Sequence, residues 1–544
     1  VSRPYNGCDS GLNMDLPKKL RALGVVPIPM DMLPLRDLEL PKRWRRVYWR
    51  YGQRILKAAE IIKKNPNLFA VYVTNFSCGP DSFILEFFAR EMKGKPYLQL
   101  EIDEHSADAG LVTRCEAFLD TLDALDDGHD RRVVHAVEQQ ADRQFTNHRT
   151  LYLPNMTPHA HAIASAMRAI GQQAEVMDES DAETIDLGRR YCSGRECYPC
   201  LLTSGDMIRQ TKRPDFDRDK TAFFMASADG PCRFGQYNEL HRQVLDRLGF
   251  EDVPIFTLDQ GSDYRGKNNL SSRFERIAAK GVLAIDALEK LLLRTRPYEV
   301  NKGDTQAWFE QSIREICKSL EANNDGEFFD CLEKAVRNLR RVEMDPEKNC
   351  PKVGVVGEVY VRTNRFANDN IIEAIEELGG EVIVPTLGEW FRYVNIVRAD
   401  FNLDTNRYLG FFRNWVSEKY VARVERKIYE AMGLEPDPEP RHLFKLAKPY
   451  LDKSFQGEAI LTMGASVEYI VDHGAAGIVN TMPFTCMPGS ICTALLRRVR
   501  EDYDDIPVLN ASFAGQKQLG GEVRLEAFMH QVKQFDERHS GAEV

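Results

Sequence analysis

Short apolar runs alternate with amphipathic stretches along most of the chain. Runs at Leu68–Thr74, Thr221–Ala226 and Ala476–Thr481 contain several β-branched or aromatic residues, and a stretch of helical period follows each run. Strands of a parallel sheet are buried on both faces, so they read as continuous apolar runs, and helices connect them. The pattern predicts an α/β protein with several parallel-sheet domains of the Rossmann-like or flavodoxin-like kind.

The same criteria assign the other elements. Further strands are predicted at Val25–Pro29, Tyr97–Ile102, Leu151–Leu153, Ala174–Met177, from Val353, and at Val253–Leu258, Glu381–Pro385 and Ile506–Leu509. Helices are predicted at Asn13–Leu23, Arg43–Lys63, Ser82–Met92, His161–Ile170, Tyr237–Leu248, Asn370–Leu378, Asn406–Met432 and Leu525–Phe535.

The chain has 544 residues, which is too many for one ordinary hydrophobic core, so we expect three or more domains. The predicted units are an α/β domain at 1–119 with Cys8 and Cys78, a helical connector at 120–149, an α/β domain at 150–270 with Cys197, Cys200 and Cys232, a helical segment at 271–350, and an α/β domain at 351–544 with Cys486.

Composition narrows the class of protein. A formal net charge of −10 argues against bulk binding to nucleic acid or to an anionic membrane. No apolar run approaches the roughly 18 to 20 residues of a membrane span, and the first residues do not form a signal peptide. The chain begins close to a loop, which indicates lost upstream sequence. Twelve cysteines without a secretory signal indicate a reducing, cytoplasmic compartment, where cysteines serve metal or redox chemistry more often than disulfides.

Five cysteines recur in one local setting, in which a strand ends, a short loop with Gly or Pro carries the Cys, and a helix begins. The setting is expected for Cys78, Cys486, Cys232, Cys200 and Cys8, although the strand of Cys8 would lie before the chain start. A helix N-terminus presents unpaired N–H groups and partial positive charge, which stabilise thiolates and the anionic clusters they hold. The repetition predicts several α/β units that converge on one buried metal centre.

The spacing of the cysteines favours an iron–sulfur cluster over zinc. Cys197 and Cys200 form one C-x-x-C pair, and a zinc ribbon would show a second pair nearby, which this chain lacks. A cluster can take its ligands from several separate loops. Four cysteines are interpreted instead as small buried hydrophobes, namely Cys115, Cys317, Cys331 and Cys350. Cys492 is interpreted as structural, and Cys192 is either a helper or a mere neighbour.

These motifs resemble a known group. The chain is similar to the acyl-CoA dehydratase activase-related proteins, in the 2-hydroxyacyl-CoA dehydratase and benzoyl-CoA reductase superfamily. The resemblance is carried by RPYNGCDSGLN (3–13), TNFSCGPDSF (74–83), EIDEH (101–105), SGRECYPC (193–200), GPCRFGQ (230–236), GEVYVRTN (357–364), PFTCMPG (483–489) and GEVRLEAF (521–528).

The resemblance implies low-potential iron–sulfur centres that an ATP-hydrolysing activase charges one electron at a time. Members dehydrate 2-hydroxyacyl-CoA or reduce benzoyl-CoA, and one branch carries an 8Fe–9S double cubane, in which two 4Fe–4S cubes share a bridging sulfide. Six cysteines would then act as ligands, three to each cube, and the matching motifs offer Cys8, Cys78, Cys197, Cys200, Cys232 and Cys486. A single 4Fe–4S cluster would need only three or four of them.

Polar residues follow two of the predicted strands. Glu101, Asp103 and His105 crowd one strand end, where they either donate protons for a reduction or form a solvated capping loop. Glu358 follows another strand together with Arg362, which could hold an anionic substrate.

The function expected from this evidence is that of a cytoplasmic iron–sulfur protein of an anaerobic type. It would accept low-potential electrons from an ATP-dependent activase and deliver them to a small substrate, as a reductase or dehydratase-like enzyme. No activase-type or Walker-type ATP loop is seen, so the activase would be a separate chain or missing upstream domains. The resemblance also implies a homodimer. Two alternatives stay open, namely a non-catalytic electron-relay or complex subunit, and a cluster-free scaffold whose cysteines only pack.

Overall fold

The computed structural model describes residues 1–44, 46–126, 148–228, 230–257, 272–516 and 520–540. The chain divides into two compact units. The first unit contains Val1–Gln144, Ser193–Glu196 and Ala228–Leu240, and the second contains Phe145–Cys192, Cys197–Ser227 and His241–Val544. The predicted fold class is confirmed, because three all-parallel sheets with helical connections occur in the described residues. None of the helices in these ranges combines the length and the apolar character that a membrane crossing requires.

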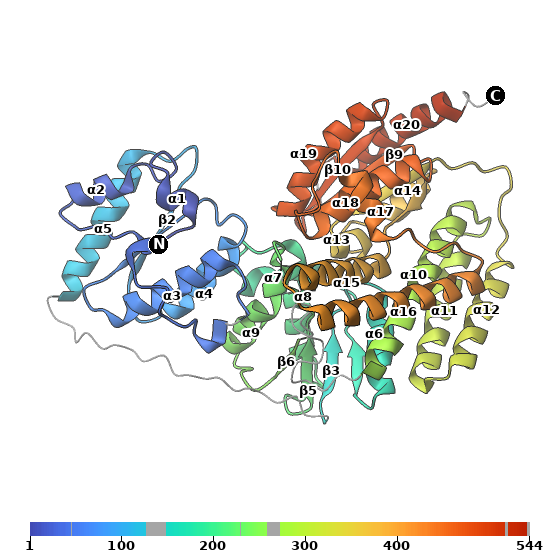
Figure 1. The fold of residues 1–544 in the computed structure, drawn as a ribbon, viewed down its shortest axis with the longest axis horizontal. Helices are drawn as coiled ribbons and strands as arrows, with labels where there is room; N and C mark the ends of the chain where they lie inside the picture. The colour runs from blue at the N-terminus through green and yellow to red at the C-terminus, as the bar shows by residue number, and fades with distance from the viewer. Residues whose placement is uncertain (45, 127–147, 229, 258–271, 517–519, 541–544) are drawn as a thin grey trace. The chain divides into compact units, whose positions relative to one another are not determined.

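The first unit is built on a two-stranded parallel sheet. Strand β1 (Ala70–Thr74) pairs with β2 (Tyr97–Glu101), with Ala70 opposite Tyr97 and Thr74 opposite Glu101. The chain start runs beside β1, where Ser2 forms a parallel bridge to Val73. Helices α3 (Arg50–Lys64) and α4 (Asp81–Glu91) lie side by side (Figure 1). The other helices of this unit are α1 (Pro4–Cys8), α2 (Leu16–Ala22), α5 (Asp108–Asp126) and two 3-10 turns at Met30–Met32 and Lys42–Trp44.

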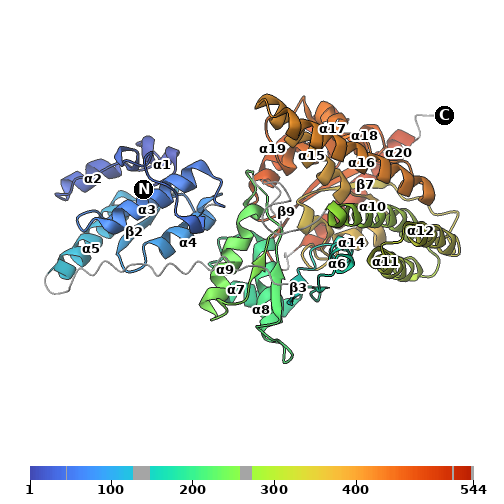
Figure 2. The ribbon, with the colours of Figure 1, turned by 60° about the horizontal axis from the view of Figure 1, so that its bottom comes forward.

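The second unit holds two four-stranded sheets. One has the order β4-β3-β5-β6, from Ala174–Val176, Thr150–Leu153, Thr221–Phe224 and Ile255–Phe256. Its connecting helices are α6 (His159–Ala169), α7 (Ala182–Tyr191), α8 (Tyr198–Thr211) and α9 (Tyr237–Arg247, whose first residues belong to the first unit). Three further helices share the apolar core of α6 (Figure 2), namely α10 (Ser272–Thr295), α11 (Asp304–Ala322) and α12 (Asp325–Leu339). Of these, α10 and α11 pack directly against α6, and α12 packs against α11.

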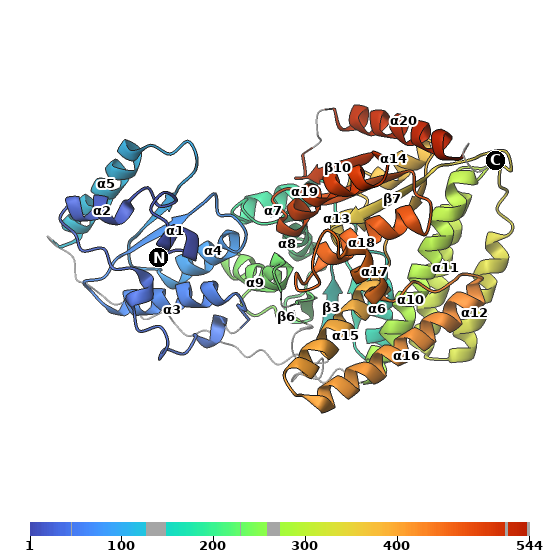
Figure 3. The same cartoon turned by 45° about the horizontal axis from the view of Figure 1, so that its top comes forward.

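The other sheet of the second unit has the order β10-β9-β7-β8, from Val508–Phe513, Gly477–Pro483, Lys352–Gly357 and Glu381–Ile383. Its helices are α13 (Val359–Thr363), α14 (Ile371–Glu377), α18 (Glu458–Val471), α19 (Met487–Asp502) and α20 (Gly521–Ser540). A hairpin of α15 (Leu387–Asp404) and α16 (Tyr408–Met432) also belongs to this unit, and its two helices lie side by side (Figure 3). Helix α17 (Pro440–Ala447) packs against α18.

Several predicted elements are wrong, each for a local reason. Residues 25–29 form no strand, because Pro27 and Pro29 lack the N–H groups that a ladder needs. The helix expected at 43–63 is divided: a 3-10 turn ends at Trp44, and α3 begins only at Arg50. Helices α7, α15 and α18 were not predicted, since no element was assigned to their residues. Residues 127–147 of the expected connector lie outside the described residues.

The strands of each sheet come from one of the three predicted α/β segments, and the helical stretch at 271–350 contains α10, α11 and α12. The division into two units cuts across this linear order, because short pieces at 193–196 and 228–240 join the first unit. The domain boundaries named above therefore stay predictions.

Candidate metal centre and buried carboxyls

The loop that carries Cys78 connects the end of β1 to the start of α4. Phe76, Ser77 and Gly79 all have left-handed backbone angles, with φ of 50°, 52° and 59°, so the chain turns tightly around the cysteine. The turn is held by Asp81, which is buried at the first position of α4 and accepts a hydrogen bond of 2.7 Å from Thr74 Oγ1. The sequence therefore places Cys78 beyond the carboxyl end of β1, as predicted.

Cys8 departs from the predicted setting. It is the last residue of the short helix α1, so no helix N-terminus lies at its backbone. The helix is nevertheless anchored to the Cys78 loop, because the side-chain amide of Asn6 donates to Asn75 and the Arg3 guanidinium lies 3.1 Å from the Asp81 carboxylate. The prediction that Cys8 follows the strand–loop–helix pattern is wrong. The segment that carries Cys8 nevertheless lies beside the loop that carries Cys78.

Cys232 is the third candidate cysteine of the first unit. It caps the 3-10 turn at Arg233–Gln236, and its carbonyl oxygen accepts a hydrogen bond of 2.7 Å from the Tyr48 hydroxyl. Arg233 Nη1 donates 3.0 Å to Ser82 Oγ, in the first turn of α4. The start of α4 is therefore the meeting point of the three loops that carry Cys8, Cys78 and Cys232. Cys8 and Cys78 are exposed and Cys232 is half-buried.

The predicted acid groups of the first unit lie nearby but are held by local contacts. Glu101, the last residue of β2, accepts a hydrogen bond of 3.3 Å from Ser77 Oγ and pairs with Arg195 at 3.4 Å. Asp103 accepts hydrogen bonds from the His105 N–H (2.9 Å) and from Ser106 Oγ (2.8 Å), and the Ser106 bond is the main cause of its lowered pKa. The His105 side chain is 84% exposed. Their geometry is that of a capping loop, and their role as proton donors stays a prediction.

In the second unit, Cys486 has the setting that the sequence predicts. It follows β9 and caps α19, and the Gly489 N–H points at its sulfur at 3.5 Å. The residue is only 7% exposed. Thr485, with φ of 66°, turns the chain just before it. The start of a long helix therefore directs a backbone N–H group toward this thiol, which favours its thiolate form.

Cys197 and Cys200 also lie at a helix start, although the element before them is a helix. Cys197 caps α8 and Cys200 belongs to its first turn, whereas α7 ends just upstream at Tyr191. The prediction that a strand directly precedes this loop is therefore wrong, because helix α7 precedes it. Both cysteines are buried, with exposed fractions of 6% and 0%.

Two glycines allow α7 and α8 to cross closely and so fix the start of α8. A Cβ added at Gly205 would lie 1.9 Å from the Thr184 carbonyl oxygen, and one at Gly188 would lie 2.2 Å from that of Leu201. The backbones therefore meet at a separation that only glycine permits.

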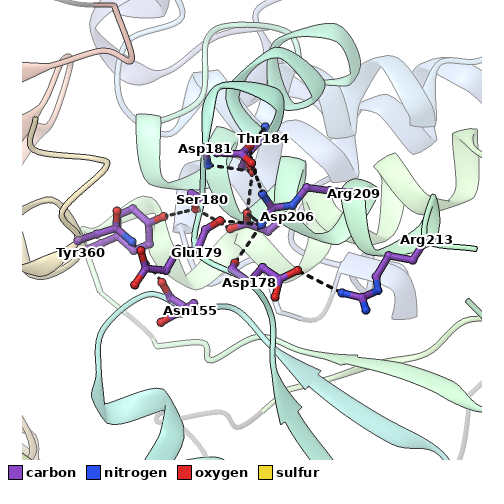
Figure 4. Close-up of polar contacts among 11 residues, drawn as sticks. Asn155, Asp178, Glu179, Ser180, Asp181, Thr184, Asp206, Arg209, Arg213 and Tyr360 are labelled. Atoms are coloured by element: carbon purple, nitrogen blue, oxygen red, sulfur yellow. Dashed lines mark hydrogen bonds and ion pairs between the residues drawn. The ribbon is translucent and has the colours of Figure 1, made fainter. Parts of the chain in front are cut away.

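A buried carboxyl lies where these two helices cross, as Figure 4 shows. Asp206 accepts hydrogen bonds from Ser180 Oγ at 2.9 Å and from Thr184 Oγ1 at 3.1 Å, and the Tyr360 hydroxyl lies 3.4 Å from Ser180 Oγ. Burial raises the pKa of Asp206 to about 7, against the opposing effect of the hydrogen bonds and of Arg209. The network connects α8 to the first residues of α13, at the carboxyl end of β7.

The start of α8 lies at the same sheet edge as Cys486. Arg189 donates to the Gly515 carbonyl at 2.8 Å, and a Cβ on Gly515 would lie 2.7 Å from the Tyr198 ring, which stands between Cys197 and Cys200. Gly515 follows β10, which pairs with β9 up to Phe513 and Pro483. The loops that carry the three cysteines of the second unit therefore gather around the carboxyl ends of β9 and β10. His241 lies beside the first turns of α8, 3.1 Å from Thr203 Oγ1, and burial lowers its pKa to about 3.

Glu358 has a half-buried partner, Glu458, that the sequence did not indicate. Glu358 caps α13 and accepts from the N–H groups of Tyr360 and Val361 at 3.2 and 2.8 Å. Glu458, at the start of α18, accepts from the Val359 N–H at 2.6 Å. Burial raises the pKa of both carboxyls, and repulsion from Glu358 helps to raise the pKa of Glu458 to about 8. The pair therefore holds a proton at neutral pH.

Arg362 lies near Glu358 and Glu458, and its guanidinium connects the ends of two strands. It is 5% exposed and donates to the carbonyls of Gly357 and Pro385 at 3.2 and 3.1 Å. Gly357, the last residue of β7, has φ of 111°, and a Cβ there would lie 2.0 Å from the Thr481 carbonyl, so this position requires glycine.

The cysteines that the sequence assigns to packing have pKa values raised by burial. This applies to Cys115, Cys317, Cys331 and Cys350. Burial, with the nearby Glu458, raises the pKa of Cys492 to about 12. Such thiols stay protonated at neutral pH and are poor metal ligands.

The geometry argues against a mononuclear metal at the cysteines. Thiolates on one tetrahedral zinc lie about 3.8 Å apart, because each bond is about 2.3 Å long. Within the described part of the chain, one group of three ligand atoms lies within 4.8 Å of one another, and it is His159, Asp286 and Glu289. Asp286 is already engaged there, since it accepts from the N–H groups of Leu387 and Gly388 at 2.8 Å each. No cysteine belongs to such a group.

Comparison with known proteins adds no family. No model of a known protein family matches the chain, and no curated protein matches it. The superfamily named from the motifs therefore stays a resemblance.

Sequence reasoning missed Glu458, Asp206 and His241. Glu458 stands at a helix start, and Asp206 and His241 are single polar residues in helical stretches, so each looks like a surface position. The burial of Asp206 and His241 and the partial burial of Glu458 follow only from the packing of α8, α9 and α18 against other elements.

Proposed function

We propose that the protein holds iron–sulfur clusters through two sets of three cysteines and delivers low-potential electrons to a small substrate. The supporting observation is that each unit brings three cysteine-bearing positions near one another. Three segments carry Cys8, Cys78 and Cys232 to the start of α4, and two segments carry Cys197, Cys200 and Cys486 to the carboxyl ends of β9 and β10. Three thiolates suit a 4Fe–4S cube, because each binds a different iron and one iron is left for another ligand.

An iron–sulfur cluster supplies one-electron reduction at low potential. The chain's residues would tune and serve it. The N–H group of Gly489 points at the Cys486 sulfur, and such contacts stabilise negative charge on cluster sulfur. In the second unit the proton held between Glu358 and Glu458 lies at the same sheet edge as Cys486, since the Glu358 N–H donates to Thr481 of β9 at 2.9 Å. A carboxyl with a pKa near 8 can donate a proton at neutral pH to a substrate that has gained an electron.

The resemblance extends the proposal to partners and compartment. An ATP-hydrolysing activase would supply the electrons, and the substrate would be an acyl-CoA, an aromatic thioester or another small molecule. Reductase and dehydratase-like chemistry both need this combination of an electron and a positioned proton. Oxygen-sensitive clusters of this kind fit a reducing cytoplasm.

A second candidate function is that of a non-catalytic electron relay. It is favoured by the first unit, where Cys8 and Cys78 are exposed and the nearby Glu101 and Asp103 are held in capping contacts. A cluster near the surface can exchange electrons with a partner protein. Single-turnover assays with the reduced protein and candidate thioesters separate the two functions, because only the enzyme converts substrate.

The primary test is anaerobic purification with iron and sulfide analysis and EPR. We expect about eight irons per chain, from two cubes of four. Cys78→Ser and Cys486→Ser should each lose iron, one from each unit, while the matched control Cys317→Ser, in the packed core of α11, should keep the wild-type count. A chain that takes up no iron after reconstitution contradicts the proposal. It would favour the alternative of a cluster-free scaffold whose cysteines only pack. About four irons, all lost with one of the two variants, would confine the cluster to that unit.

We also propose that the chain forms a homodimer through the hairpin of α15 and α16. Among the residues described, twenty large apolar side chains are exposed, and eight of them lie between 401 and 420. They are Phe401, Leu403, Tyr408, Leu409, Phe412, Trp415, Val416 and Tyr420. The opposite face of α16 packs inward through Glu425, Ile428, Tyr429 and Met432.

The area of these eight exposed side chains and the spacing of those on α16 suit contact with a second copy of the chain. Half-exposed aromatic and aliphatic side chains of this number offer on the order of 700–800 Å², near the about 800 Å² per partner of a standard interface. Tyr408, Phe412, Val416 and Tyr420 recur every four residues and lie symmetrically about residue 414, so two antiparallel copies of α16 would match their stripes around a twofold axis. In that register the exposed Asp404 would lie near Arg423 of the other copy.

Analytical ultracentrifugation of the full chain tests the dimer. Phe412→Glu should produce monomers, whereas the control Val523→Glu, at an exposed apolar position of α20, should leave the dimer intact. Asp404→Arg and Arg423→Asp should each weaken the dimer, and their combination should restore it. A monomeric wild-type chain, or a dimer that Phe412→Glu leaves unchanged, refutes this surface.

A further inference from the structure

A cavity of about 280 Å³ lies along the outer strand β8 in the second unit. It is enclosed by α10, β8, the first turn of α15 and the C-terminal end of α18. Leu293, Val382, Val384, Pro385 and Tyr469 form an apolar part of its wall. None of the cysteines or carboxyls of the proposed electron-transfer function lines this cavity, so it is a separate feature of the fold.

Glu389 is the unpartnered acid of the cavity. The residue is 6% exposed, and its carboxyl has no hydrogen bond or ion pair with any residue that the structure describes. The other acids are engaged: Asp437 accepts from Thr386 (2.9 Å), Tyr429 and Lys290, Glu468 pairs with His473 at 3.1 Å, and Glu381 accepts from Tyr298 at 2.6 Å. A buried carboxyl without a partner costs free energy, so such a group calls for a ligand or a proton.

The charges of the wall decide which kind of ligand fits. Lys290, Arg294 and Lys352 line the cavity with three basic side chains, and Glu381, Asp437 and Glu468 line it with three acids besides Glu389. Burial, then repulsion from Asp437 and Glu468, raises the pKa of Glu389 to about 8. Arg362 and Lys290 also act on the Glu389 carboxyl and oppose the rise of its pKa. One positive charge in place of the proton leaves the net charge of the cavity unchanged, whereas a divalent ion would add a charge.

The size and the geometry favour an organic cation over a metal ion. The volume exceeds that of a bare ion, and part of the wall is apolar. Among the described residues, no cavity acid belongs to a group whose ligand atoms lie within 4.8 Å of one another. An ammonium group on a short apolar body matches both the charge and the wall.

We propose that this cavity binds a small organic ammonium ion, with Glu389 as the anchoring carboxylate. The ammonium N–H donates to the Glu389 carboxylate, the apolar body lies against Val384 and Tyr469, and the proton of Glu389 leaves to solvent. No covalent bond is made or broken apart from the O–H bond of Glu389. At pH 7, below the pKa of about 8, most of the Glu389 carboxyl is protonated, so binding releases close to one proton for each cation bound.

Isothermal titration of the full chain with n-butylammonium chloride at pH 7 tests the proposal. The titration is repeated in two buffers with different ionisation enthalpies, so that the number of protons released is measured directly. We expect saturable binding at one site per chain with release of nearly one proton. Glu389→Gln, which preserves the shape and removes the titrating group, should weaken binding about tenfold or more, as for the loss of a hydrogen bond to a charged group.

Glu381→Gln is the matched control, because it lies in the same wall but its carboxyl already accepts from Tyr298. It should change the affinity by far less than Glu389→Gln does. The proposal is overturned if butylammonium produces no saturable heat, if Glu389→Gln binds as well as wild type, or if MgCl₂ binds more tightly than butylammonium with the same proton release. Unchanged thermal midpoints of both variants show that they fold. None of these outcomes depends on the iron content of the protein.

Discussion

Cys78 and Cys486 occupy the same topological position, between a strand and a helix, but the two sets of cysteines to which they belong differ in access to solvent. In the first unit a sheet of two strands carries them, and Cys8 and Cys78 are exposed. In the second unit a four-stranded sheet and the crossing of α7 and α8 surround them, and Cys197, Cys200 and Cys486 are at most 7% exposed. The strand–loop–helix pattern therefore fixes where a cysteine lies along a sheet edge, while the number of layers around that edge decides whether water reaches it.

The largest expected difference is in thiol reactivity. In protein freed of metal, we expect Cys8 and Cys78 to react with iodoacetamide on the order of a thousandfold faster than Cys197, Cys200 and Cys486, because the buried thiols must wait for local opening. Peptide mass spectrometry over a time course measures the five rates. Equal alkylation rates in the two sets would contradict the difference in solvent access between them.

The next effect concerns the buried Asp206. Its pKa is about 7 in the folded chain and near 3.8 when unfolded, so the folded state holds a proton that the unfolded state loses. The contribution of Asp206 to the unfolding free energy of the second unit is therefore largest below about pH 4. It falls as the pH rises toward 7, by at most about 4 kcal/mol in total. Urea unfolding between pH 5 and pH 8 should show that fall in wild type and a smaller one in Asp206→Asn.

The exposed Asp219→Asn is the control for that series, and its pH profile should follow the wild type. A profile of Asp206→Asn that parallels wild type would mean that other groups, such as Glu458, cause the whole pH dependence.

A smaller effect is expected where α7 and α8 cross. Gly205→Ala places a methyl group against the Thr184 carbonyl, so we expect a loss of about 1–3 kcal/mol in unfolding free energy and weaker iron retention by the second unit. Gly110→Ala, in α5 of the first unit, meets nothing within 4 Å and should be neutral or slightly stabilising. Chemical denaturation of both variants checks the pair, and equal losses would contradict the close crossing.

The smallest effect concerns the Cys232 loop. Tyr48→Phe removes the hydrogen bond to the Cys232 carbonyl, and we expect it to cost about 1 kcal/mol in the first unit. Hydrogen exchange of the 230–236 segment should rise, while exchange around Cys486 should stay unchanged. Faster exchange in both segments would mean that this contact is not local to the first unit.

Much of the fold could be predicted because its signal is local. Continuous apolar runs identified β1 and β9, and turn residues beside Cys78 and Cys486 marked where each strand gives way to a helix. The failures have local causes as well: two prolines prevent the predicted strand near Pro27, and no element was assigned to the residues of α7, which lie just before the loop that carries Cys197. For the candidate site, the residue types were found but Glu458 was not, since nothing near it in sequence indicates burial.

By itself the sequence determined the α/β class, the order of most strands and helices, and the cysteines that stand at strand ends, because hydrophobic period and turn chemistry act over a few residues. Only the tertiary structure decided that Asp206 and Glu389 are buried and that Glu458 faces Glu358, since a carboxyl's pKa depends on neighbours far away in the chain. It also decided which cysteine loops lie together, because hydrogen bonds such as Arg233 to Ser82 join segments separated by 151 positions.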